Sequence, residues 1–144
     1  MVLTGYFVPR DDTKYVIEHY KENLDGTYPS VASEIEEFRW TTDTIAVATW
    51  KIYEWFTFSW NAEWTVMSGN INGSGDLVLK LFYDRNKYMI TWKNDDSILE
   101  VDEWVFYWAM PTYDWVTPVK TWSDLITWVT YIFDWWAPNV SIVT

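Results

Sequence analysis

Alternating hydrophobic and polar positions along this chain predict β-strands. The clearest pattern covers 76–85 (DLVLKLFYDR). Because successive side chains of a strand point to opposite faces, the odd-numbered residues Leu77 to Tyr83 would line one face, and Val78, Lys80 and Phe82 the other. Trp, Tyr, Phe, Val, Ile and Thr dominate the chain, and these are the residues that favour strands.

The sequence also predicts two β-hairpins. A strand over 14–20 is followed by Asp25-Gly26, a strong turn signal, and the return strand is expected over 28–38. A second pair is expected over 88–93 and 98–105, joined by a polar turn at 94–97.

Three other segments are less specific. The residues 43–53 and 124–133 fit either a strand or a helix, and 68–75 is a polar turn region. That region holds three glycines but no lysine and no following helix signal, which excludes a phosphate-binding P-loop. The predicted fold class is therefore mainly β, with α+β as the alternative.

An internal similarity indicates tandem small modules. Residues 10–17 (RDDTKYVI) resemble 84–90 (DRNKYMI), and each is followed by a strand and a polar turn. We expect a tail of a preceding repeat at 1–12, one complete module at 13–87 and a partial, truncated module at 88–144.

Composition limits the partners. The 144 residues carry a net charge of −11, which disfavours nucleic acid and anionic lipid. The absence of cysteine excludes disulfides and thiolate chemistry. No apolar run is long enough for membrane insertion, and the first residues lack the pattern of a signal peptide, so a signal of an exported parent would lie outside this chain.

Residues with catalytic or metal-binding potential are sparse. His19 is the only histidine, and we expect a structural or surface role for it. The carboxylates of Glu100 and Asp102 would share a strand face, but nothing marks a cleft. Acidic clusters without the spacing of a calcium loop occur at Asp11-Asp12, Asp95-Asp96 and Glu34-Glu36-Glu37. We therefore predict no enzyme activity, no catalytic residues, no metal and no cofactor.

Two families of bacterial surface repeats resemble parts of the chain. The residues 15–28 (YVIEHYKENLDGTY) and 75–86 (GDLVLKLFYDRN) resemble the MucBP-like repeat. The internalin B-repeat, also called the Listeria–Bacteroides repeat, is similar to the stretches 90–96, 99–103, 110–113 and 133–138. Trp92 and Trp136 match tryptophans of that second family.

The resemblance implies β-grasp-like modules in a secreted or cell-wall protein outside the cell. Such modules act as stalk or adhesion segments without catalytic residues. The expected partner is a glycan or protein on the surface of a host or neighbouring cell. The sequence leaves the oligomeric state open.

Several tryptophans stand where these families have glycine. They are Trp40, Trp55, Trp108, Trp115 and Trp135. Glycine at such positions supplies a positive φ or a close backbone approach, which a bulky residue resists. We hypothesise that a codon read here as tryptophan, with UGA the natural candidate, is read as glycine in the source cell. Deliberate or selected tryptophan substitution is the competing explanation.

Genuine tryptophans would support a different function. Aromatic faces stack on sugar rings, and exposed aromatic patches mark binding sites. The alternative hypothesis is therefore a carbohydrate-binding module that uses Trp55, Trp60 and Trp64, or Trp108 and Trp115.

Overall fold

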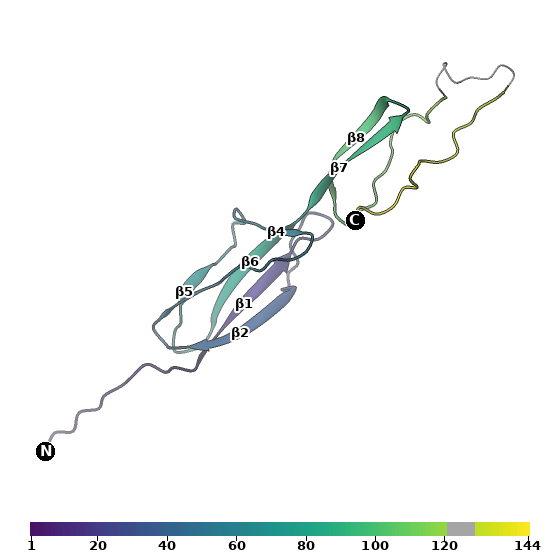
Figure 1. Cartoon of the computed structure of the whole chain (residues 1–144). Coiled ribbons are helices and arrows are strands. Elements are labelled where there is room, and N and C mark those ends of the chain that lie inside the picture. The colour runs from purple at the N-terminus through teal and green to yellow at the C-terminus, as the bar shows by residue number, and fades with distance from the viewer. Residues whose placement is uncertain (121–128) are drawn as a thin grey trace. The chain divides into compact units, whose positions relative to one another are not determined.

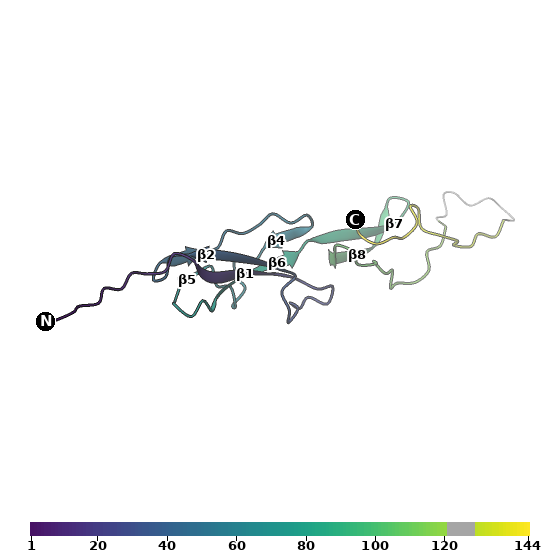
Figure 2. The same ribbon diagram turned by 90° about the horizontal axis from the view of Figure 1, so that it is seen from below.

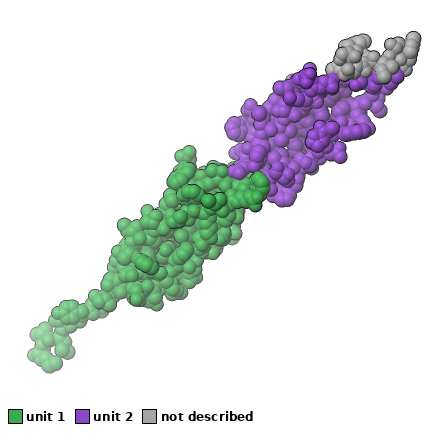
Figure 3. Space-filling view, in the orientation of Figure 1, with its two compact units in different colours: residues 1–85 green, residues 86–144 purple. Residues whose placement is uncertain are grey.

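The computed structural model describes residues 1–120 and 129–144. Eight strands and no helix occur in these two ranges, which confirms the predicted mainly β class (Figure 1). The chain divides into two compact units, residues 1–85 and 86–144 (Figure 3). This division lies two residues before the boundary expected from the sequence.

A four-stranded mixed sheet forms the body of the first unit. Its strand order is β2-β1-β6-β4, with β1 at Thr13–Lys21, β2 at Glu34–Trp40, β4 at Phe56–Phe58 and β6 at Leu77–Arg85. The two central strands, β1 and β6, run parallel, and β2 and β4 pair antiparallel with them at the edges (Figures 1 and 2).

The core lies on one face of this sheet. Leu79, Leu81 and Tyr83 of β6 are buried on that face, as the alternating pattern predicts. The residues Ala46, Ala48 and Ile71 cover them from β3 (Ile45–Val47), β5 (Ser68–Asn70) and the residues that follow these strands. Burial of each large aliphatic side chain contributes about 2 kcal/mol.

The first predicted hairpin differs from the observed one. The turn at Asp25-Gly26 forms, and the Asp25 carboxylate accepts a hydrogen bond from the backbone N–H of Thr27 at 2.9 Å. However, β2 begins at Glu34, so the predicted return strand from 28 is wrong in its first six residues. The reason is that the pairing begins with His19 opposite Glu34, which leaves 22–33 as a loop. Of the ambiguous segment 43–53, only β3 is regular structure, and no helix forms there.

The second unit is built on a hairpin. Strands β7 (Lys87–Asn94) and β8 (Ser97–Phe106) pair antiparallel around the turn at Asp95-Asp96, as predicted. Trp92 is only 6% exposed and contacts the rings of Tyr113 and Trp136, whose centroids lie 5.6 and 4.9 Å away. Half of the predicted element at 124–133, residues 124–128, lies outside the described residues, and the described half is not a strand.

Three tryptophans adopt the left-handed backbone that favours glycine. The φ angles are 70° at Trp55, 67° at Trp104 and 72° at Trp108. Asp43 and Asp95 also have positive φ, which aspartate tolerates better. A left-handed conformation costs a residue with a β-carbon about 1–2 kcal/mol.

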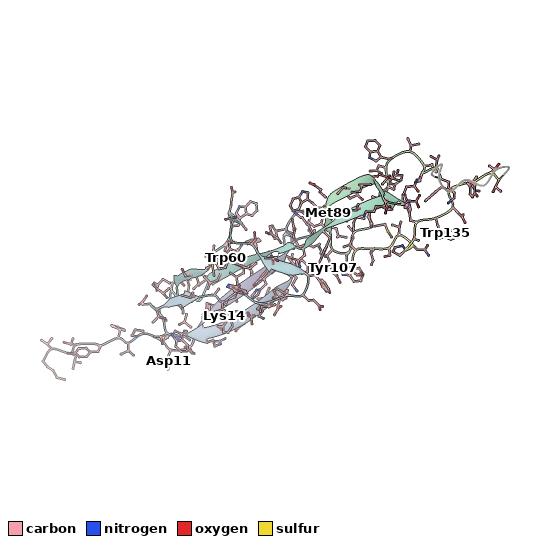
Figure 4. The ribbon with its side chains drawn as sticks, turned by 45° about the horizontal axis from the view of Figure 1, so that its top comes forward. Asp11, Lys14, Trp60, Met89, Tyr107 and Trp135 are labelled. Atoms are coloured by element: carbon pink, nitrogen blue, oxygen red, sulfur yellow. The ribbon has the colours of Figure 1, made fainter. Side chains whose placement is uncertain are left out.

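The local geometry explains the positive φ angles of the three tryptophans. Trp55 and Trp108 occupy the third position of tight turns, which are closed by hydrogen bonds from Phe56 N to Tyr53 O and from Ala109 N to Phe106 O. A positive φ at that position is the reason such turns carry glycine. In the β7–β8 ladder, Glu103 and Trp104 together oppose the single residue Met89, labelled in Figure 4. This is a β-bulge, where glycine commonly supplies the left-handed residue.

A positive φ, one of the two reasons expected for glycine, is thus confirmed at Trp55 and Trp108 and is not found at the other three positions. Trp40, Trp115 and Trp135 do not have a positive φ. Trp40 pairs with Thr13 at the end of β2, so its backbone is extended. The positive φ of Trp104 was not predicted from the sequence, because this residue lies inside a strand without flanking turn residues.

Candidate functional site

A buried histidine anchors a polar network in the first unit. His19 is 0% exposed, with Nδ1 2.8 Å from the Tyr83 hydroxyl and Nε2 2.9 Å from a Glu36 carboxylate oxygen. The Tyr83 hydroxyl also accepts the backbone N–H of Lys51 at 3.1 Å. All three bonds are satisfied together when Tyr83 donates to Nδ1 and the Nε2–H group donates to Glu36.

Lys51 joins two of the three glutamates of β2, Glu34 and Glu36. Its ammonium lies 2.6 Å from a Glu34 oxygen and 2.7 Å from a Glu36 oxygen. Tyr53 donates its hydroxyl hydrogen to the other Glu34 oxygen at 2.6 Å. Glu34 and Glu36 point to the same side of β2, opposite His19 and Ile17 of β1, and therefore meet the histidine on the core face.

The hydrogen bonds shift the titration of this network. The bond from Lys51 lowers the pKa of Glu34 to about 2, with Tyr53 adding to the effect, and it also lowers the pKa of Glu36. The same bonds, first that to Glu34, raise the pKa of Lys51. Burial and the bond to Glu34 raise the pKa of Tyr53. The ion pair is therefore fully charged at neutral pH and binds β2 to the segment after β3.

Acid should weaken this network. A carboxylate whose folded pKa is lowered stabilises the fold above its unfolded pKa, 4.5 for Glu34, and this stabilisation is lost as the pH falls toward 2. Because Glu34 is 38% exposed, we expect a loss of no more than about 1 kcal/mol. Urea melts between pH 7 and pH 3 should show a smaller pH dependence for Glu34→Gln. The exposed Glu63, changed to glutamine, is the control, and equal slopes in all three proteins would contradict the assignment.

An open groove lies next to the network. Its volume is about 340 Å³, and its lining residues are Tyr15, Ile17, Glu36, Phe38, Val47, Thr49, Trp50 and Lys51. It runs between β1 and β2 on one side and the residues 47–51 on the other. Three aromatic rings, those of Tyr15, Phe38 and Trp50, therefore border the Glu36–Lys51 ion pair.

The rings of the groove are held by other rings. Tyr15 and Phe38 are stacked with centroids 5.5 Å apart. Trp50 stacks on Phe58 at 6.2 Å and meets the edge of Trp60 at 6.4 Å. Phe38 and Trp50 remain 39% and 42% exposed, so their outer faces are open to a ligand.

The tryptophans predicted to bind sugar lie in several places. Trp60, labelled in Figure 4, is exposed and contacts Phe58 and Trp50, so it supports one wall of the groove. Trp64 contacts Phe82, which lies on the opposite face of the sheet from Tyr83. Trp55 is half-buried in its turn.

The other two predicted tryptophans belong to the second unit. Trp108 is exposed and contacts Tyr107, and Trp115 is exposed. Two hollows of about 580 and 380 Å³ lie in this unit, the first between Pro118 and Trp135 and the second between Trp92 and Pro138. The lining residues of these hollows include neither Trp108 nor Trp115.

Sequence reasoning missed Tyr15, Phe38 and Trp50 as a group. Tyr15 and Phe38 lie opposite each other on the same face of paired strands. Their proximity could be predicted only from the register of β1 and β2, which the sequence pattern does not give. Trp50 enters from a segment without regular structure, so no periodicity marks it.

The comparisons with known proteins add no relative. No family model, no curated protein and no solved structure matches the chain. Across residues 1–120 and 129–144, no group of three or more histidine, cysteine or acidic side chains is placed to hold a metal ion. The same residues contain no helix with the length and apolar character needed to cross a membrane.

Proposed function

We propose that this chain is a non-catalytic, load-bearing module of a bacterial cell-surface or secreted protein, acting as a stalk or adhesion segment. The observation that carries the proposal is the parallel pairing of the first and last strands of the first unit. Tyr15 to Lys21 of β1 pair with Leu77 to Tyr83 of β6 in an unbroken register.

Parallel terminal strands resist tension in a specific way. A pull on the start of β1 and the end of β6 acts at opposite ends of the pair, so it slides the strands along each other. Every hydrogen bond of the ladder then carries load at the same time. We call this β1–β6 ladder the clamp. Its core face carries Ile17, Leu79 and Leu81, all at most 4% exposed, which keeps water from replacing the hydrogen bonds.

The connection between units fits load transfer. A single residue, Asn86, separates the end of β6 from the start of β7, so tension along the chain passes directly from one unit into the next. The mixed sheet with a central parallel pair and the resemblance to MucBP-like and internalin B-repeats also support a surface module. The net charge of −11 suits a solvated stalk.

Single-molecule pulling tests the clamp. Because the chain has no cysteine, Asp12→Cys and Lys87→Cys provide unique handles just before β1 and just after β6. We expect a high unfolding force in this direction, several-fold above that of a second pair of handles. That control pair, Asp12→Cys with Ser74→Cys, pulls both strands from their starting ends and opens the ladder one bond at a time.

Equal unfolding forces in the two directions would contradict a load-bearing clamp. The control uses the same protein with the same sheet and differs only in one handle. Denaturant melts of both double variants should agree, because Asp12 and Ser74 are exposed and Lys87 lies outside the sheet of the first unit. Any difference in force then reports the direction of pulling and not the stability of the fold.

A further inference from the structure

We propose that the groove between β2 and the residues 47–51 binds a neutral carbohydrate. A sugar ring would stack on the open faces of Phe38 and Trp50, and its hydroxyls would bond to Glu36 and Lys51. This site differs from every set of tryptophans expected from the sequence, and it does not depend on the clamp.

The aromatic walls favour a sugar ring. One face of a pyranose presents C–H groups, which pack on aromatic rings, while its edge presents hydroxyls that require polar partners. The groove offers both kinds of surface side by side. Because Phe38 is stacked on Tyr15 and Trp50 is held by Phe58 and Trp60, little side-chain entropy is lost when a ligand binds.

The polar groups of the groove can accept and donate further hydrogen bonds. A carboxylate has about four acceptor positions, and the described bonds of Glu36 are those to His19 and Lys51. The Lys51 ammonium has three donors, and its described bonds to Glu34 and Glu36 account for two. The network fixes both groups in place before a ligand arrives, which lowers the cost of binding.

Charge and size select the class of ligand. The single Lys51 ammonium pairs with two carboxylates, those of Glu34 and Glu36, and the chain is acidic overall. The site therefore repels anions, so a neutral polyhydroxy ligand is favoured over an acidic one. An apolar peptide or lipid chain would cover the ion pair without bonding to it, which is unfavourable. A volume of about 340 Å³ is at the small end for ligand sites and fits a short saccharide.

NMR titration of the full chain tests the site. Cellotriose and chitotriose are the probes, added to protein labelled with ¹⁵N. We expect millimolar binding, with amide shifts concentrated at 36–38 and 47–51. Phe38→Leu and Trp50→Leu remove a ring but retain an apolar side chain, and each should weaken binding about tenfold.

Matched controls separate this groove from other aromatic surfaces. Trp64→Leu and Trp115→Leu remove exposed rings outside the groove and should leave the affinity unchanged. Shifts centred away from the groove, affinities unaffected by Phe38→Leu and Trp50→Leu, or no shift with either probe would overturn the proposal. Because the amide shifts are measured on the unaltered chain, they show whether the saccharide binds in the groove even if a variant is unstable. The pulling experiment is unaffected by any of these results.

Discussion

Replacing Trp92 by glycine is expected to lower the free energy of unfolding of the second unit by about 4 kcal/mol. Trp92 is 6% exposed and contacts both Tyr113 and Trp136. Its indole N–H donates to Asp102 at 2.8 Å, a bond that the substitution also removes. Loss of the ring opens a cavity in a unit whose hairpin has few other buried side chains.

Denaturant melts followed by NMR signals of the second unit measure this loss. The matched control is Trp115→Gly, which removes the same ring from a side chain that is 69% exposed. The control should change the free energy by no more than about 0.5 kcal/mol. Similar effects at the two positions would contradict the assignment of Trp92 to the core.

Glycine at the three left-handed tryptophans should have the opposite effect. We expect the combined Trp55→Gly, Trp104→Gly and Trp108→Gly protein to be more stable by about 2 kcal/mol in sum over the two units. Relief of the left-handed conformation gains about 1–2 kcal/mol at each residue, and the greater freedom of glycine in the unfolded chain offsets part of that gain. Removal of the exposed Trp104 and Trp108 rings should also reduce aggregation.

Alanine at the same three positions is the control. Alanine removes the ring but keeps the β-carbon that makes the left-handed backbone unfavourable. The gain in stability should therefore appear with glycine and be absent with alanine. An equal gain with both residues would assign the strain to the ring and not to the backbone. Trp115 and Trp135 also stand at glycine positions of the resembling families, but glycine there is expected to give no gain in stability because neither has a positive φ.

Local patterns were enough to find the strongest strands. The alternation in β6 and β1 predicted both strands and the buried face of β6, because those residues repeat every second position. The parallel pairing of β1 with β6 could not be read from the sequence, since it joins residues about sixty positions apart and depends on how the intervening chain folds. The strand β4 was missed because three residues are too few to show a period.

The side-chain contacts beside the groove also could not be predicted from local sequence patterns. Glu34 and Glu36 stood out as acidic residues, yet their partners His19, Lys51 and Tyr53 are set by the strand register and by a segment without periodicity.

The residue types typical of tight turns were more informative. The residues around Trp55 and Trp108 resemble tight turns, and both have the backbone of a glycine turn. The bulge at Trp104 required the pairing of β7 with β8.

The tryptophans of this chain thus fall into distinct environments, with Trp92 in a core and Trp55, Trp104 and Trp108 at glycine-like backbone. Peptide mass spectrometry on the protein made in its native cell tests this distinction most directly. We expect glycine masses at 55, 104 and 108 and tryptophan masses at 92 and 136. Tryptophan masses at all five positions would contradict the codon hypothesis and leave the three rings as genuine, strained features of the protein.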